Sequence, residues 1–116
     1  MEIRLATKPI AIKDIKELAQ KQFGNIIKAT VDVEKRILAL GGELHADEEQ
    51  FLLEKNSAQK DLWGINLYPA KFGTPEFIEF DSMINLRPSQ NNMSRGVEDV
   101  AVKEEIKKVV SELVTE

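Results

Sequence analysis

The sequence contains no cysteine among its 116 residues and only one histidine, His45. The lack of thiols excludes thiolate catalysis, cysteine-ligated zinc and disulfide bonds. The glycines do not form a phosphate-loop pattern, so no nucleotide is indicated. There is no G-x-S-x-G motif, and a single histidine without recognisable context does not indicate a serine-hydrolase triad.

Long apolar runs and excess basic charge are also missing. No run of 18 or more apolar residues and no charged-then-apolar leader occur, so we expect a cytoplasmic protein. The formal net charge is −4 and the pI is about 5.1. This balance disfavours nucleic acids and anionic membranes as partners, because binding to either requires a basic surface. A local arginine patch is still compatible with binding one small anion.

What is present is typical of a folded protein, with 42% hydrophobic and 31% charged residues. The length fits one domain, 1–116. The pattern predicts the order β-α-β-β-α-β-β-α, and therefore a single α+β domain whose antiparallel or mixed sheet has its helices packed on one face. Strands are expected at 1–5, 26–33, 36–40, 62–68 and 77–87, and helices at 11–23, from Asp47 through 51–55, and after Asp99.

Several local signals support these elements. Apolar residues at helical spacing mark 11–23, and Gly24 suits the position after that helix. Asp47 and Gln50 match a capping box, and Asp99 is a good N-cap for the last helix. A single helix through 28–40 is the alternative to the hairpin of 26–33 and 36–40. The buried stripe of the last helix is expected to be Val102, Ile106, Val109, Val110 and Leu113.

The most distinctive segment is the polar loop within 78–99, in a region without lysine or, from 82 to 97, any acidic residue. Arginine forks with hydroxyl and amide donors suit a carboxylate or phosphate, so this loop is a candidate binding site. The alternative is a loop whose polar groups only hydrogen-bond one another. The candidate ligand-binding residues are Arg87, Ser89, Gln90, Asn92, Ser94 and Arg95.

A second candidate is a metal site. Glu43, His45 and Asp47 alternate along the chain and would share one face of an extended segment. One histidine with two carboxylates suits a divalent metal, which could drive hydrolysis through a bound water. The alternatives are that Asp47 serves as a helix cap and that His45 is a hydrogen-bonded residue beside a glycine turn.

A third candidate is the polar face of the strands 62–68 and 77–87. Its side chains could line a shallow pocket, and a pair of acids such as Glu79 and Asp81 could act as general acid and base. The alternative is a set of solvated cross-strand pairs. We expect Trp63 to belong to the core. The polar residues are Asp61, Asn66, Tyr68, Glu79, Asp81 and Asn85.

Three segments together resemble a family of short bacterial and archaeal proteins known only as a domain of unknown function. They are GGELHADEE (41–49), DLWGINLYP (61–69) and FDSMINLRPSQNNMSRGVED (80–99). The resemblance covers nearly the whole chain and implies a small stand-alone domain. It implies no activity, cofactor or catalytic residue.

The sequence therefore leaves three functions open. The favoured one is a binding or regulatory domain whose 87–95 loop takes a small polar or anionic ligand or a protein partner. The second is a small metal-assisted hydrolase that uses His45 and nearby carboxylates. The third is a homo-oligomer in which exposed strand edges pair. The sequence does not indicate a cofactor.

Overall fold

The fold is organised around the hairpin of β3 (Ile27–Asp32) and β4 (Ile37–Leu40) in a computed structural model that describes residues 2–116. The Asp32 carboxylate shapes the connecting turn by accepting the backbone N–H groups of Glu34 and Lys35, each at 2.9 Å. Arg36 completes the turn in the left-handed region, at φ 59°. The predicted hairpin is confirmed, and the alternative helix through 28–40 is wrong.

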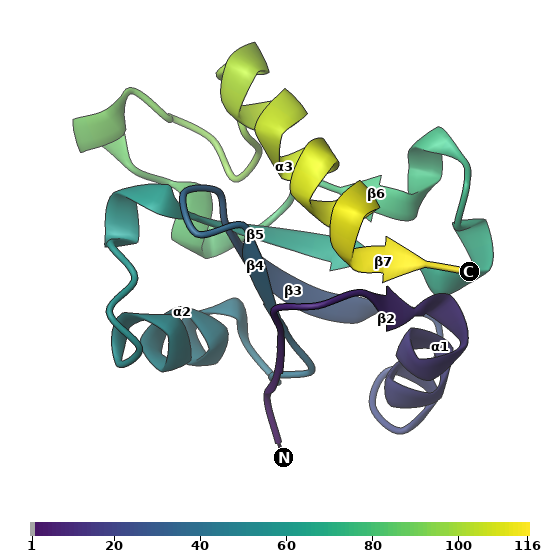
Figure 1. Cartoon of the computed structure of the whole chain (residues 1–116). Helices are drawn as coiled ribbons and strands as arrows, with labels where there is room; N and C mark the ends of the chain where they lie inside the picture. The colour runs from purple at the N-terminus through teal and green to yellow at the C-terminus, as the bar shows by residue number, and fades with distance from the viewer. Residues whose placement is uncertain (1) are drawn as a thin grey trace.

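A five-stranded sheet extends from this hairpin in the order β1-β4-β3-β5-β6, and every neighbouring pair is antiparallel. The strands β2 and β7 form a small parallel ladder between the two ends of the chain (Figure 1). The remaining elements are β1 (Arg4–Ala6), β2 (Ile10–Ala11), α1 (Ile12–Gln20), α2 (His45–Leu53), β5 (Leu62–Leu67), β6 (Ile78–Glu79), α3 (Val100–Leu113) and β7 (Val114–Thr115).

These elements confirm the predicted α+β class, and β2 and β7 are additions to the predicted order. The strand expected at 1–5 is observed as β1, although its first residue lies outside the described residues. α1 ends at Gln20, three residues earlier than expected. Gly24 takes φ +92° in the following turn, where its N–H donates to the carbonyl of Ala19 at 2.7 Å.

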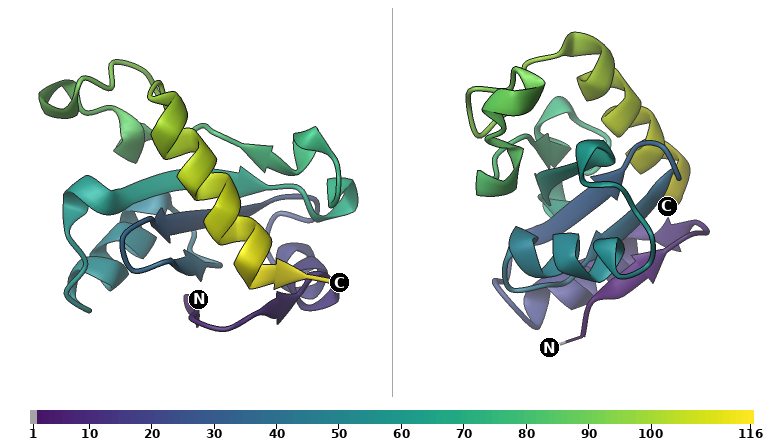
Figure 2. Two further views of the ribbon diagram at one scale, coloured as in Figure 1. Left: turned by 45° about the horizontal axis from the view of Figure 1, so that its top comes forward. Right: turned by 90° about the vertical axis from the view of Figure 1, so that its left-hand side faces the viewer.

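The helices lie on both faces of the sheet, so the prediction that they share one face is wrong. α1 and α3 cover one face, and Figure 2 shows α3 running diagonally across it. α2 packs on the other face, where Leu52 contacts Ala39 of β4 and Leu62 of β5. The physical reason is that the central strands carry apolar side chains on both faces, and each set must be buried.

The last predicted strand is much shorter than expected, because β6 ends at Glu79 and the 3₁₀ turn Met83–Asn85 follows. The side-chain amide of Asn85 takes the place of a strand partner for Gly64 of β5. It accepts the N–H of Gly64 at 2.8 Å and donates to its carbonyl at 2.9 Å. The alternating pattern of 77–87 resembles a strand, but a side chain completes the hydrogen bonding there.

The two helix starts predicted from capping differ in outcome. Asp99 caps α3 as expected, and its carboxylate accepts the N–H groups of Ala101 at 2.8 Å and Val102 at 3.3 Å. α2 begins at His45 after Leu44, so the expected capping by Asp47 is wrong. Asp47 instead lies in the first turn of α2, where a negative charge still stabilises the helix. None of the helices in residues 2–116 has the length and apolarity that crossing a bilayer requires.

Candidate functional site

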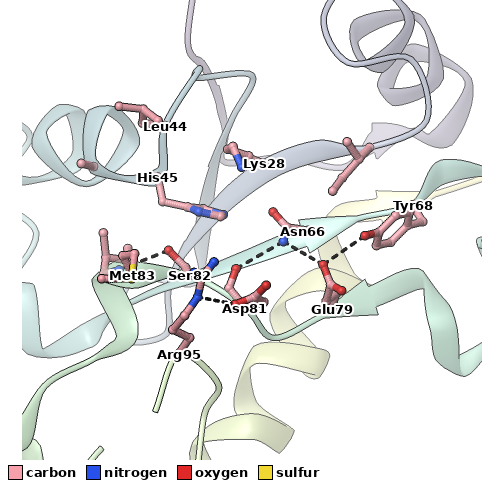
Figure 3. Close-up of a pocket in the computed structure, with 13 residues that line it drawn as sticks. Lys28, Leu44, His45, Asn66, Tyr68, Glu79, Asp81, Ser82, Met83 and Arg95 are labelled. Atoms are coloured by element: carbon pink, nitrogen blue, oxygen red, sulfur yellow. Dashed lines mark hydrogen bonds and ion pairs between the residues drawn. The ribbon is translucent and has the colours of Figure 1, made fainter. Parts of the chain in front are cut away.

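The face of the sheet that carries α2 contains a cavity of about 680 Å³ (Figure 3). Its floor comes from β3, β5 and β6, and its walls come from the N-terminus of α2, the turn Met83–Asn85 and the polar loop. Cavities of this size suit small molecules. The polar residues that line it are Lys28, His45, Asn66, Tyr68, Glu79, Asp81, Ser82 and Arg95.

Three residues form a row across the floor of this cavity. Lys28 of β3 is paired in register with Asn66 of β5, and Asn66 is paired with Glu79 of β6. Directly opposed residues on neighbouring strands project to the same face, so the row presents a cation, an amide and an acid in sequence. Neither Lys28 nor Glu79 forms an ion pair within residues 2–116.

Asn66 at the centre of the row is 5% exposed. Its Nδ2 donates to Glu79 Oε1 at 2.9 Å and to the carbonyl of Asp81 at 3.2 Å. Because both neighbours are acceptors, the nitrogen must point toward them and the oxygen away. Asn66 Oδ1 is buried and has no hydrogen-bond partner within the described residues. Buried acceptors without partners are rare and cost free energy, so this atom is available to accept a hydrogen bond from a bound molecule or a water.

His45, the first residue of α2, closes one side of the cavity. Its Nε2 lies 2.7 Å from the carbonyl of Ile65, so Nε2 carries the proton and donates it. Burial lowers the pKa of His45, with Lys28 and Arg95 acting in the same direction and the Ile65 carbonyl and Asp81 opposing them. His45 is therefore neutral at pH 7, and Nδ1 is an acceptor for which residues 2–116 supply no partner.

Gly64 makes this arrangement possible. A Cβ placed on Gly64 would lie 2.6 Å from both Cβ and Oγ of Ser82, and 3.1 Å from Cδ2 of His45. Only glycine allows these two side chains to pack on β5 at this distance. Ser82 is held there because its N–H donates to the carbonyl of Arg95 at 2.9 Å. The cavity wall therefore depends on a close approach in the middle of β5.

The rim combines an ion pair with apolar side chains. Arg95 Nε donates to Asp81 Oδ1 at 2.7 Å, and both side chains are substantially exposed. Leu44, which precedes α2, and Met83, which begins the turn Met83–Asn85, are 59% and 62% exposed and also line the cavity. Tyr68 extends the polar side, where its hydroxyl donates to Glu79 Oε1 at 3.1 Å. A molecule in the cavity would meet charged groups at the sheet and apolar groups near α2.

The candidate loop separates into a structural part and a cavity part. Arg87 is 7% exposed, and its guanidinium donates to the backbone carbonyls of Ile84 at 2.9 Å, Gln59 at 2.8 Å and Leu62. It also stacks 4.6 Å from the ring centroid of Trp63. Burial lowers the pKa of Arg87, opposed by the carboxylate of Glu49 at 3.9 Å. Arg87 links four segments of the fold and does not line the cavity that holds Arg95.

The other loop candidates also lie apart from the cavity. Asn92 is buried, and its Nδ2 donates to the carbonyls of Asn85 and Gly96, each at 2.7 Å. Ser89, Gln90 and Ser94 are exposed. The loop hypothesis expected Arg87 and Arg95 to meet in one cavity, and the structure does not bring them together.

The predicted metal ligands are not assembled. His45 is buried against β5, whereas Glu43 and Asp47 are exposed. Residues 2–116 contain no group of three His, Asp or Glu side chains arranged to hold a metal ion. The alternation that suggested a shared strand face does not apply, because the segment from His45 onward is helical.

Of the six polar residues on the third candidate face, Asn66, Tyr68, Glu79 and Asp81 line the cavity, whereas Asn85 bonds to the backbone and Asp61 lies elsewhere. Lys28 and Ser82 were missed, although Lys28 alternates with the apolar residues of β3 and that alternation was a usable signal.

Comparison with known proteins yields a family and no function. A family model described as a protein of unknown function (DUF5674) matches residues 4–113, and the chain belongs to this family. The resemblance seen in the sequence is thereby confirmed. No curated protein and no solved structure matches the chain.

Proposed function

We propose that this protein is a binding domain for a small polar molecule, which it holds in the cavity between α2 and the strands β3, β5 and β6. The observation that carries this proposal is Asn66, whose buried Oδ1 has no hydrogen-bond partner within residues 2–116 while its Nδ2 donates to two acceptors. A donor on a bound molecule would satisfy this oxygen and recover the free energy that its isolation costs.

The surroundings support a preformed site. Groups from β3, β5, β6, α2 and the polar loop converge on one cavity, although they lie far apart in the sequence. The polar loop contributes Arg95, which connects this proposal with the loop hypothesis from the sequence. The metal-assisted hydrolase has no support here, because the described residues lack a metal-binding group of side chains.

Filling the cavity mouth with a bulky side chain tests the proposal. Ala46 is exposed, lines the cavity and is the second residue of α2. Ala101 is its matched control, because it is also exposed and is the second residue of α3, away from the cavity. A panel of small carboxylates, phosphates, amines, amino acids and sugars is screened by thermal unfolding against the wild type, Ala46→Trp and Ala101→Trp.

We expect at least one compound to raise the melting temperature saturably, by several degrees at about 100 times its Kd. The shift should disappear in Ala46→Trp and remain in Ala101→Trp. A shift that survives in Ala46→Trp would place the binding elsewhere on the molecule. A flat panel would argue against a small-molecule site and favour a protein partner or pairing between copies of the chain.

A further inference from the structure

We propose that the ligand is a zwitterion that carries both a carboxylate and an ammonium group, as free amino acids and short peptides do. This inference rests on the proposed binding function and adds the chemical class of the ligand. Its basis is the distribution of charge over the cavity floor, where two charged groups have no ion-pair partner within residues 2–116. They are one acid, Glu79, and one cation, Lys28, whose Nζ lies 5.7 Å from the ring centroid of Phe23.

The register places these two charges at opposite ends of the row. Lys28 and Glu79 are separated by the single strand β5, so their backbones lie about 10 Å apart. The two side chains are long enough to approach a small molecule that lies over Asn66 between them. A cation and an acid that face the same cavity without neutralising each other are matched best by a ligand with both charges.

The hydrogen-bonding groups follow the same division. The acceptors at the ammonium end are the Glu79 carboxylate and the free oxygen of Asp81 beyond its bond to Arg95. Asn66 Oδ1, which points away from Glu79, is a further acceptor at the centre of the row. The donors at the carboxylate end are the Lys28 ammonium and the backbone N–H groups of His45 and Ala46, which line the cavity at the start of α2 and have no acceptor within residues 2–116. Figure 3 shows Lys28 and Glu79 on opposite sides of Asn66.

The charge balance argues against a ligand of one sign. The cavity contains Lys28 and Arg95 against Glu79 and Asp81, and the neutral imidazole of His45 adds no charge. A phosphate or dicarboxylate would leave Glu79 facing negative charge, whereas a diamine would leave Lys28 facing positive charge. Like charges brought close together in the cavity would repel each other and oppose binding. The apolar rim formed by Leu44 and Met83 suits an apolar side chain on the ligand.

Titration calorimetry with charge-blocked compounds tests the inference. A panel of free α-amino acids and dipeptides is titrated into the full chain, and each binder is compared with its methyl ester and its N-acetyl derivative. Monocarboxylates, phosphates and amines of similar size are included. We expect a zwitterion to bind and each blocked form to bind at least about tenfold more weakly, as expected for the loss of a charged hydrogen bond.

Variants then assign the two ends of the ligand. Lys28→Met should abolish the preference for the free acid over the ester and keep the preference for the free amine over the N-acetyl form. Glu79→Gln should do the reverse. Lys13→Met and Glu17→Gln on the exposed side of α1 are the matched controls and should behave as the wild type. The length of the tightest binder separates free amino acids from peptides.

Two outcomes would overturn the inference and can be told apart. One outcome is a blocked compound, monocarboxylate, phosphate or amine that binds as tightly as any zwitterion and no longer binds to the Ala46→Trp variant. This outcome would contradict a zwitterionic ligand and leave the proposed binding function intact. A panel in which no compound binds would contradict both.

Discussion

The two faces of the central sheet are closed in different ways. On one face, α1 and α3 bury a large continuous apolar cluster that contains Ile15, Val31, Leu38, Ile65 and Ile106 at 0% exposure. On the other face, α2 buries only a small cluster around Leu52 and leaves the cavity open over β5 and β6. One face therefore supplies most of the apolar stabilisation, and the other is free to carry polar groups.

Two features keep the second face open. α2 has nine residues and packs on β3 and β4, so it does not extend over β6. Buried polar side chains occupy part of the remaining space, including Glu48, whose carboxyl group accepts from Gly42 N–H at 2.9 Å and Thr30 Oγ1 at 3.0 Å. Such groups hold their neighbours by hydrogen bonds and resist collapse into an apolar core.

The sharpest contrast is expected from truncating a leucine on each face. Leu38→Ala removes a fully buried side chain beneath α1 and α3, and we expect a loss of about 3 kcal/mol in the free energy of unfolding. Leu44→Ala, at the exposed rim of the cavity, should change it by less than about 0.5 kcal/mol. Urea unfolding followed by circular dichroism measures both. Equal losses would contradict the asymmetry between the faces.

The next largest difference in stability is expected between substitutions of the two loop arginines, Arg87 and Arg95. Arg87→Lys removes a planar fork that satisfies three backbone carbonyls, which a single ammonium does not reproduce, so we expect a loss of about 2 kcal/mol. Arg95→Lys should cost less than about 0.5 kcal/mol, because its pair with Asp81 is exposed. Urea unfolding of both variants and the wild type measures the two losses. An Arg87→Lys variant as stable as the wild type would contradict the structural role of Arg87.

The buried carboxyl of Glu48, on the side of α2 that faces the sheet, should make the stability of the protein depend on pH. Burial raises the pKa of this carboxyl well above the ordinary 4.5, so the folded protein keeps it protonated where the unfolded chain ionises it. Its contribution to stability is complete below pH 4.5 and declines as the pH rises toward the folded pKa, by about 1.4 kcal/mol for each pKa unit of difference.

Glu48→Gln should therefore gain stability relative to the wild type between pH 4.5 and pH 7. The comparison uses thermal unfolding of both proteins at several pH values, and their difference isolates Glu48 from all other titrating groups. A difference that stays constant with pH would show that the Glu48 pKa is not raised.

The smallest effect on stability is expected at the open end of the cavity. Tyr68→Phe removes an exposed hydroxyl that donates to Glu79, and the free energy of unfolding should change by less than about 0.5 kcal/mol. The same variant should alter ligand affinity, because Glu79 loses one of the donors that orient it. Urea unfolding and calorimetry on one sample separate the two effects. A large loss of stability would mean that this end also supports the fold.

The sequence allowed much of the fold to be predicted, because the signals involved are local. The alternation in 26–33 and 62–68 and the cap at Asp99 depend on neighbours a few residues away. The prediction failed at 77–87 and at Asp47. Asn85 replaces a strand partner by bonding to Gly64, 21 residues away, and α2 starts at His45, whose side chain bonds to Ile65 of β5, 20 residues away.

The candidate site was less predictable, because its residues come together through contacts between distant segments of the chain. Arg87 and Arg95 looked equivalent in the sequence, since both lie in one polar loop. Only the tertiary structure separated them, because the carbonyls that bury Arg87 come from Gln59 and Leu62. The sequence by itself determined the α+β class, the period of each strand and the cap of the last helix, all through interactions between residues near one another.

The tertiary structure alone decided which polar side chains meet. Lys28, Asn66 and Glu79 become neighbours through strand register, and His45 and Ser82 join them because Gly64 leaves room on β5. Register and close packing depend on contacts between distant segments, and a single sequence contains no local signal for either.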